Sequence, residues 1–381
     1  MKKIYKIALF FIQISLILQF FIFNQTSVCY AKSEKFDAES MITIERTSGR
    51  VLFSKDEHKR LPMASTTKIL TAIVAIENIK DLDEKHQISK SACGIEGSSI
   101  YLKQGEHLSV RELLYGLMLR SGNDSAVAIA EIVSGSVEKF VEKMNFYVNK
   151  LGLKDTHIVT VNGLHDDNHY TSAYDLANIT AYALSNKTFA EIVSTKKTKI
   201  SNEYSKYSDK VRMLKNKNKL LSMVEGADGV KTGYTKKAGK CFVGSATRDG
   251  MQIIVVVLNS RTMFEGAAEC IEKAFLNYKM VKLFDSGKVY DIDVENIKTQ
   301  KIPILIKKEI VLPLNKEEIA NVKAKVKLNN NKASMISSDD VVGTIDVWVK
   351  NNLIFLQNLY TINIDKEECF EDYLKKIING F

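Results

Sequence analysis

The amino-acid sequence predicts an α+β fold in which a cluster of helices packs against an antiparallel sheet. Apolar residues recur at helical spacing over residues 108–133, 137–151 and 172–184. After Gly226 the pattern changes to short strand-like runs, and Arg-Asp-Gly at 248–250 supplies a hairpin turn between two of them. These blocks of helix and strand together indicate an α+β layout.

Residues 1–31 are typical of a signal peptide. Lys2, Lys3 and Lys6 precede an almost wholly apolar stretch from Ile7 to Phe23, and Cys-Tyr-Ala at 29–31 is an acceptable cleavage site. We therefore expect an exported protein that works at the extracytoplasmic face of the cell membrane or in the cell wall. The apolar stretch is long for a signal peptide, so an uncleaved anchor is the alternative.

A β-hairpin and then a buried helix are expected next. Residues 41–46 and 51–53 flank a Thr-Ser-Gly-Arg turn, and Pro62 precedes an apolar run over 69–76. This run predicts a helix that begins near Ser65 and is buried nearly all round. Ser65 and Lys68 are three residues apart, so they face the same way on that helix.

The rest of the first domain, residues 35–282, continues this alternation of blocks. The helical pattern over 108–133 is broken by a tight loop, Ser-Gly-Asn-Asp at 121–124. Later segments are expected to form strands at 229–234, 241–247 and 251–259, followed by a helix at 264–278.

A small all-β domain over residues 288–365 and a terminal amphipathic helix over 367–381 are expected at the C-terminus. Short alternating runs separated by turns indicate the β domain, which we interpret as a spacer. The apolar face of the helix consists of Phe370, Tyr373, Leu374, Ile377, Ile378 and Phe381. Such a helix either packs on the β domain or contacts a membrane surface.

Composition narrows the choice of partners. The formal net charge is +9, but an exported protein does not meet nucleic acid, so the charge suggests attraction to anionic wall polymers or lipid headgroups. An ordinary solvated surface is the alternative. The five cysteines show no paired motif, and His165 and His169 lie in a loop-like stretch. We expect neither a metal nor a cofactor.

Three short motifs bear functional groups suited to nucleophilic catalysis. The first motif is Ser-Thr-Thr-Lys at 65–68. A serine such as Ser65 is a poor nucleophile unless a base lies beside it, and Lys68 could be that base if burial or a second cation lowered its pKa. Ser121-Gly122-Asn123 can present a hydroxyl and an amide, and Lys231-Thr232-Gly233 a cation and a hydroxyl. Gly233 would let a peptide backbone approach closely.

In this order, Ser-x-x-Lys, Ser-x-Asn and Lys-Thr-Gly resemble the motifs of the serine D-Ala-D-Ala carboxypeptidases of peptidase family S11, the low-molecular-mass penicillin-binding proteins. The resemblance covers roughly residues 36–278. It implies a β-lactamase/transpeptidase-like fold and the removal of the terminal D-alanine from peptidoglycan pentapeptides. It also implies that penicillin acylates the enzyme as a substrate mimic.

The resemblance assigns catalytic roles to three side chains. It implies that Ser65 is the nucleophile, that Lys68 is its general base and that Ser121 relays protons to the leaving amine. The oxyanion hole would consist of the backbone N–H groups of Ser65 and Tyr234. Some relatives have histidine where this chain has Tyr234.

The resemblance also implies a set of substrate-binding residues. Asn123 would hold the substrate amide, and Lys231 and Thr232, on the strand that includes Gly233, would meet the terminal carboxylate. Arg261 would support that carboxylate site.

Three alternatives accompany this hypothesis. A β-lactamase of class A needs an additional glutamate on a loop, and no matching glutamate is found between Asn123 and Lys231. A cross-link D,D-endopeptidase of the same fold would use the same residues. An inactive wall-binding module would not need Lys68 paired with Ser65, so the complete motif set argues against it.

Overall fold

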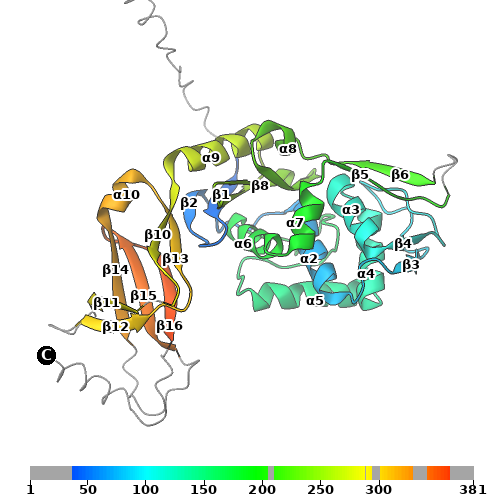
Figure 1. The fold of residues 1–381 in the computed structure, drawn as a ribbon. Coiled ribbons are helices and arrows are strands. Elements are labelled where there is room, and N and C mark those ends of the chain that lie inside the picture. The colour runs from blue at the N-terminus through cyan, green and yellow to red at the C-terminus, as the bar shows by residue number, and fades with distance from the viewer. Residues whose placement is uncertain (1–36, 205–209, 288, 294–300, 329–340, 361–381) are drawn as a thin grey trace, which may run out of the picture. The chain divides into compact units, whose positions relative to one another are not determined.

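The computed structural model describes residues 37–204, 210–287, 289–293, 301–328 and 341–360, and its ribbon is drawn in Figure 1. The predicted signal peptide and the predicted terminal helix at 367–381 lie outside these residues. Among the helices that are described, none combines the length and the apolar character needed to cross a bilayer.

A five-stranded antiparallel sheet forms the centre of the first domain. Its strand order is β2-β1-β9-β8-β7. The strands are β1 (Ser40–Glu45), β2 (Val51–Lys55), β7 (Ala227–Thr235), β8 (Gly239–Arg248) and β9 (Met251–Leu258). The predicted hairpins and the α+β fold are therefore confirmed. β7 pairs with β8 on one side and forms an edge of the sheet on the other, and an edge strand can accept an extended peptide.

Helices cover both faces of this sheet (Figure 1), so its middle strand, β9, is buried along nearly all of its length. The longer helices are α2 (Lys68–Asn78), α3 (Val110–Arg120), α4 (Asn123–Ser134), α5 (Val137–Lys150), α6 (Ala173–Leu184), α7 (Lys187–Ser194) and α9 (Met263–Asn277). Each expected helix of this domain is present, and α7 was not expected.

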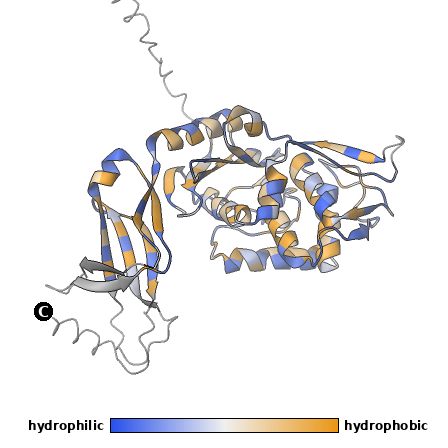
Figure 2. Cartoon of the chain, in the orientation of Figure 1, coloured by the Kyte–Doolittle hydropathy of each residue, from blue (hydrophilic) through white to orange (hydrophobic). Residues whose placement is uncertain are grey.

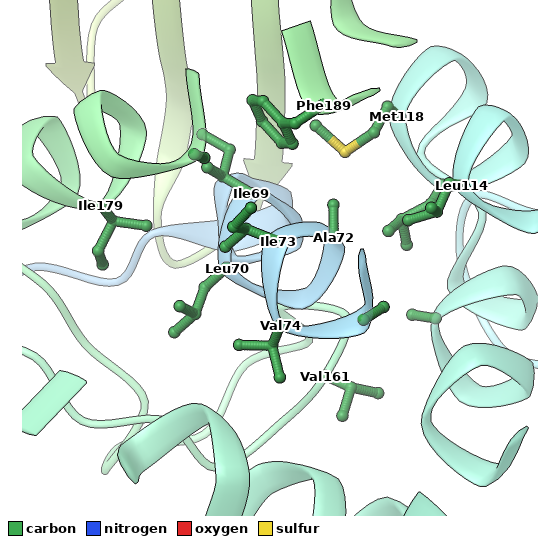
Figure 3. Packing of buried hydrophobic residues seen from close by; sticks show 14 of the residues in the cluster. Ile69, Leu70, Ala72, Ile73, Val74, Leu114, Met118, Val161, Ile179 and Phe189 are labelled. Carbon is green, nitrogen blue, oxygen red and sulfur yellow. The ribbon is translucent and has the colours of Figure 1, made fainter. Parts of the chain in front are cut away.

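The apolar helix α2 lies inside the helical cluster. Figure 3 shows Ile69, Ala72 and Ile73 of α2 surrounded by side chains from α3, α6 and α7, among them Leu114 and Phe189. All residues from Lys68 to Ala75 are buried. The predicted burial of this helix is confirmed.

Several short elements were not predicted. They are β3 (Lys85–Gln87), β4 (His107–Ser109), β5 (Lys197–Ser201), β6 (Val211–Lys215) and α8 (Leu220–Met223). β3 pairs with β4, and β5 with β6, as two-stranded ribbons. Elements of three to five residues contain too few side chains to establish a period.

The C-terminal part is rich in strands, as predicted. It contains β10 (Lys279–Phe284), β11 (Val289–Asp293), β12 (Lys301–Leu305), β13 (Ile310–Leu314), β14 (Val322–Leu328), β15 (Val341–Val349), β16 (Asn352–Tyr360) and one short helix, α10 (Lys316–Asn321). A separate apolar core includes Val326, Ile345 and Val347. Alternating hydropathy is visible along β14 in Figure 2, where exposed lysines alternate with inward apolar residues.

Candidate active site

Ser65 lies on a single turn of 3₁₀-helix, Ala64–Thr67, and the α-helix begins only at Lys68. The predicted helix start near Ser65 is therefore confirmed, with its first turn a 3₁₀ turn that continues directly into α2. Ala64 has a left-handed backbone (φ 48°), and the Thr66 and Thr67 hydroxyls donate to the Met63 and Ala64 carbonyls at 2.6 and 2.8 Å. These bonds tighten the turn. Ser65 stays partly exposed, whereas its neighbours are buried.

Lys68 contacts the Ser65 hydroxyl from beneath. Its Nζ is 3.0 Å from Ser65 Oγ and 2.7 Å from Asn123 Oδ1, and it also donates to the Asn162 carbonyl. Burial lowers the pKa of Lys68 well below its ordinary value. The charge of Lys231 lowers that pKa further. A neutral Lys68 amine can accept the Ser65 proton.

Ser121 and Asn123 occupy the sharp turn between α3 and α4. Ser121 caps α3 in the left-handed region (φ 64°) and is 6% exposed, and α4 starts at Asn123. The Asn123 amide bridges two elements, since Oδ1 accepts from Lys68 and Nδ2 donates to the Glu96 carbonyl at 2.6 Å. The turn thus brings Asn123 to Ser65 and Lys68 and places Ser121 two residues away along the backbone.

A buried carboxylate fixes the loop beside this turn. Asp124 is fully buried and accepts from Ser99 Oγ at 2.5 Å and from the backbone N–H groups of Ile100 and Leu102 at 3.0 and 3.1 Å. The sequence places Asp124 in the tight loop at 121–124, next to the Ser-Gly-Asn motif, and predicts no separate role for it. The one signal in the sequence for such a role is the position of this acid in the first turn of a helix, where a carboxylate is stabilised.

Lys231 and Gly233 lie on the inner face of β7. Lys231 is 1% exposed, and its Nζ donates to the Thr232 carbonyl at 2.8 Å. Burial lowers the pKa of Lys231 to about 7, with the charge of Lys217 a second cause. Thr232 is half-buried, and the Tyr234 ring is exposed.

Gly233 allows β7 to lie directly against the serine turn. A Cβ at Gly233 would lie 3.1 Å from Ser65 N and 3.2 Å from both Ala64 Cβ and the Met63 carbonyl. Contacts this close are tighter than most Cβ contacts, so a side chain here would require the serine turn to shift by a few tenths of an ångström. The backbone N–H of Ser65 therefore lies beside the edge strand, where the backbone of Tyr234 follows Gly233.

Arg261 lies in the segment between β9 and α9, and its side chain is exposed. This segment is bonded to the start of β8, because Ser260 N donates to the Lys240 carbonyl at 3.0 Å and Lys240 Nζ donates to the Arg261 carbonyl at 3.2 Å. Lys240 pairs with Tyr234 across the sheet. Arg261 is therefore near the end of β7 that holds Gly233 and Tyr234.

Two residues near the site were not predicted. The carbonyl of Asn162 accepts from Lys68, and the charge of Lys217 lowers the pKa values of both Lys68 and Lys231. Neither residue belongs to a recognisable motif. Within the described residues, no three His, Cys, Asp or Glu side chains gather as metal ligands.

Geometry and fold define a class of protein: a serine hydrolase in which a buried lysine lies within hydrogen-bond distance of a partly exposed serine. Residues 27–262 match the family model described as D-alanyl-D-alanine carboxypeptidase. Residues 278–367 match the model described as penicillin-binding protein 5, C-terminal domain. The chain belongs to the D-alanyl-D-alanine carboxypeptidase family, which confirms the predicted resemblance.

Curated relatives and solved structures agree with this assignment. The chain is 34% identical to the D-alanyl-D-alanine carboxypeptidase DacF of Bacillus subtilis, over 91% of this chain and 90% of the relative. It is 33% identical to DacA of Escherichia coli, over 90% and 88%. Penicillin-binding protein 5 from Haemophilus influenzae superposes with a TM-score of 0.72 at 29% identity, covering 86% of this chain and 97% of that structure.

Proposed function

We propose that this protein is a serine-type D-Ala-D-Ala carboxypeptidase that removes the terminal D-alanine from peptidoglycan stem peptides through an acyl-enzyme at Ser65. The observation that carries the proposal is the buried Lys68 amine, 3.0 Å from Ser65 Oγ. Family membership supports the reaction class, and the motif geometry supports the roles below.

Acylation begins with proton transfer. Neutral Lys68 takes the Ser65 proton as Oγ attacks the carbonyl carbon of the penultimate D-alanine. The backbone N–H groups of Ser65 and Tyr234 stabilise the oxyanion of the tetrahedral intermediate. The C–N bond then breaks as Ser121 gives its proton to the leaving amine of the terminal D-alanine, and Lys68 passes the proton that it took from Ser65 on to Ser121.

Deacylation reverses the same chemistry with water as the nucleophile. Water attacks the ester carbonyl and gives one proton to Lys68, which returns it to the Ser65 oxygen as the ester bond breaks. The new carboxylic acid releases the second proton to solvent, so the shortened peptide leaves with a carboxylate. With a β-lactam, the ring amide takes the place of the peptide bond, so the acyl-enzyme forms at the same oxygen.

Substrate binding uses the edge strand and its cations. An extended peptide can pair with the free edge of β7. Lys231, Thr232 and Arg261 would receive the terminal carboxylate, and Asn123 the substrate amide. The cationic field also favours an anionic chain end over an internal peptide bond.

The test is to incubate the whole chain with a fluorescent penicillin and, separately, with a pentapeptide that ends in D-Ala-D-Ala. The wild type should become labelled and release D-alanine, whereas Ser65→Ala should do neither. Labelling without D-alanine release would instead favour an endopeptidase or transpeptidase. Absence of labelling would refute the catalytic proposal.

A transpeptidase deserves comparison because a solved structure of the Streptomyces K15 DD-transpeptidase is 33% identical, with a TM-score of 0.58 and coverage of 62% of this chain. Adding an amine acceptor to the peptide assay separates the two activities. A carboxypeptidase releases D-alanine without forming a new peptide bond to the acceptor.

The rate of acylation should depend on pH in a bell shape. The rate rises where Lys68 loses its proton, and it falls where Lys231, whose pKa is about 7, loses the charge that binds the carboxylate. Lys231→Arg should move the falling limb to higher pH, because arginine keeps its proton. The measurement is the second-order rate constant for acylation, determined at about ten pH values between pH 5 and pH 10. An unmoved falling limb in Lys231→Arg would assign that limb to another group.

We propose further that the protein is exported and works at the extracytoplasmic membrane face. Residues 1–31 support export, and the amphipathic pattern of 367–381 supports contact with a membrane surface. Flotation with anionic vesicles tests the contact, with residues 1–31 removed from both proteins so that the apolar leader cannot anchor them: residues 32–381 should float, and residues 32–360 should not. Equal behaviour of the two proteins would instead favour packing of the segment on the β domain.

A further inference from the structure

The segment that follows α5 lies directly on the serine turn. Gly163 has a left-handed backbone (φ 80°), and a Cβ there would lie only 2.0 Å from the Ala64 carbonyl oxygen. Thr71 on α2 donates to the Val161 carbonyl at 2.7 Å, and Lys68 donates to the Asn162 carbonyl. The position of residues 159–163 therefore determines one of the three hydrogen bonds of Lys68.

His169 links this segment to the serine turn through both of its ring nitrogens. The side chain is 3% exposed. Nδ1 accepts from the backbone N–H groups of Val159 and Thr160 at 3.0 and 3.2 Å. Nδ1 therefore carries no proton, and the neutral ring has its N–H at Nε2.

That Nε2–H points at the turn itself. It lies 2.8 Å from Thr67 Oγ1, whose own hydroxyl donates to the Ala64 carbonyl at 2.8 Å. The chain of bonds thus runs from the 159–160 backbone through His169 and Thr67 to the residue before Ser65. Each hydrogen is used once, so the direction of every bond is fixed.

We propose that His169 and Thr67 are positioning residues that hold Ser65 and Lys68 in register for acylation. Neither touches the reacting atoms. His169 fixes the segment that supplies the Asn162 carbonyl, and Thr67 fixes the turn that presents Ser65. Loosening either end should lengthen the Ser65–Lys68 contact, and a displacement of about 1 Å typically costs up to about 100-fold in rate.

The electrostatic surroundings support a neutral ring. Burial lowers the pKa of His169 to about 4; Asp166 opposes this shift, whereas His157, His165 and Lys68 add to it. Because the folded pKa lies below the ordinary value of about 6.5, the folded state is favoured in full above pH 6.5. That contribution is lost as pH falls towards 4.

Two isosteric substitutions separate the functions of the ring nitrogens. His169→Asn places an acceptor near Nδ1 and loses the bond to Thr67, and His169→Gln places a donor near Nε2 and loses the acceptor. Thr67→Val removes the hydroxyl, and Thr67→Ser restores it. His107→Asn is the matched control, because His107 is about half exposed and pairs with Glu203.

The measurements are the rate constant for labelling by fluorescent penicillin, its pH profile and the thermal midpoint of each variant. Thr67→Val and His169→Asn should each acylate about 10- to 100-fold more slowly, and the double variant no more slowly than the worse single one. The rising limb of the pH profile should move upward as water reaches Lys68. Thr67→Ser should recover most of the rate, and His107→Asn should match the wild type.

Other outcomes of these measurements would contradict the proposal. A Thr67→Val enzyme that acylates like the wild type, or a double variant whose loss is the product of the single losses, would overturn the proposal. A lowered thermal midpoint with an unchanged rate and pH profile would show a merely structural role. The inference rests on the proposed function, and the two fail in different ways. A wild type that is not labelled would refute the proposed function. A loss of rate that is confined to the variants would leave that function intact. If His169 variants do not fold, the Thr67 pair alone decides.

Discussion

Replacing Lys68 with methionine should leave a folded protein that fluorescent penicillin acylates about 10³-fold more slowly, because the general base 3.0 Å from Ser65 Oγ is lost. Methionine has a similar length and suits the buried site. The Ser65 hydroxyl would keep its position without an acceptor for its proton. Stopped-flow labelling measures the rate, and circular dichroism verifies the fold.

Lys68→Arg distinguishes the base from the charge. The guanidinium keeps a cation beneath Ser65 but does not lose its proton at any working pH. If Lys68 acts as a base, both variants should be inactive. If Lys68→Arg were acylated within tenfold of the wild-type rate, Lys68 would act through its charge, and the roles assigned to it would be wrong.

Replacing Asp124 with asparagine should lower the free energy of unfolding by about 3 kcal/mol or more. The carboxylate accepts from Ser99 Oγ and from the backbone N–H groups of Ile100 and Leu102. These three bonds reach Oδ2, while Oδ1 accepts from the backbone N–H of Ser125 at 2.9 Å. An amide has only one acceptor oxygen, so in either orientation its NH₂ would face a donor in this fully buried site. Hydrogen bonds to charged acceptors contribute about 1.5–3 kcal/mol each.

Urea denaturation followed by circular dichroism tests this expectation, since the only tryptophan, Trp348, lies in the C-terminal part. Asp83→Asn is the control: Asp83 is exposed and pairs with Arg111 at the surface, where ion pairs contribute little. Acylation by Asp124→Asn should also slow, because Asn123 N donates to the Ser98 carbonyl on the loop that Asp124 holds. A variant as stable as Asp83→Asn would show that the loop does not depend on the carboxylate.

The sequence predicts those helices and turns whose side chains follow a repeating pattern or a known turn motif. The apolar run after Lys68 predicted the buried α2, and Ser-Gly-Asn at 121–123 predicted the break between α3 and α4. Both follow from local periodicity and turn chemistry. The three motifs could be found because the site is built from side chains of distinctive type.

Contacts with the backbone could not be predicted in this way. Every residue has a carbonyl, so nothing in the sequence identified that of Asn162 as a partner of Lys68. His169 had been weighed only as a metal ligand, and its two-sided hydrogen bonding depends on elements about 100 residues apart, since Thr67 is its partner. The left-handed Ala64, which delays the start of α2, has the same origin in long-range packing.

Because α2 is buried, acylation of Ser65 should indicate whether the helical cluster around this helix is folded. The lowered pKa of Lys68, on which its proposed role as a base depends, requires that the helix carrying it stays surrounded by the apolar side chains of α3, α6 and α7. A molecule whose helical cluster has opened would expose Lys68 to water, and the pKa of its amine would rise towards the ordinary lysine value. Penicillin should therefore label only molecules whose helical cluster is intact. The fraction labelled by a brief pulse of antibiotic during denaturation would then equal the fraction of molecules that are still native.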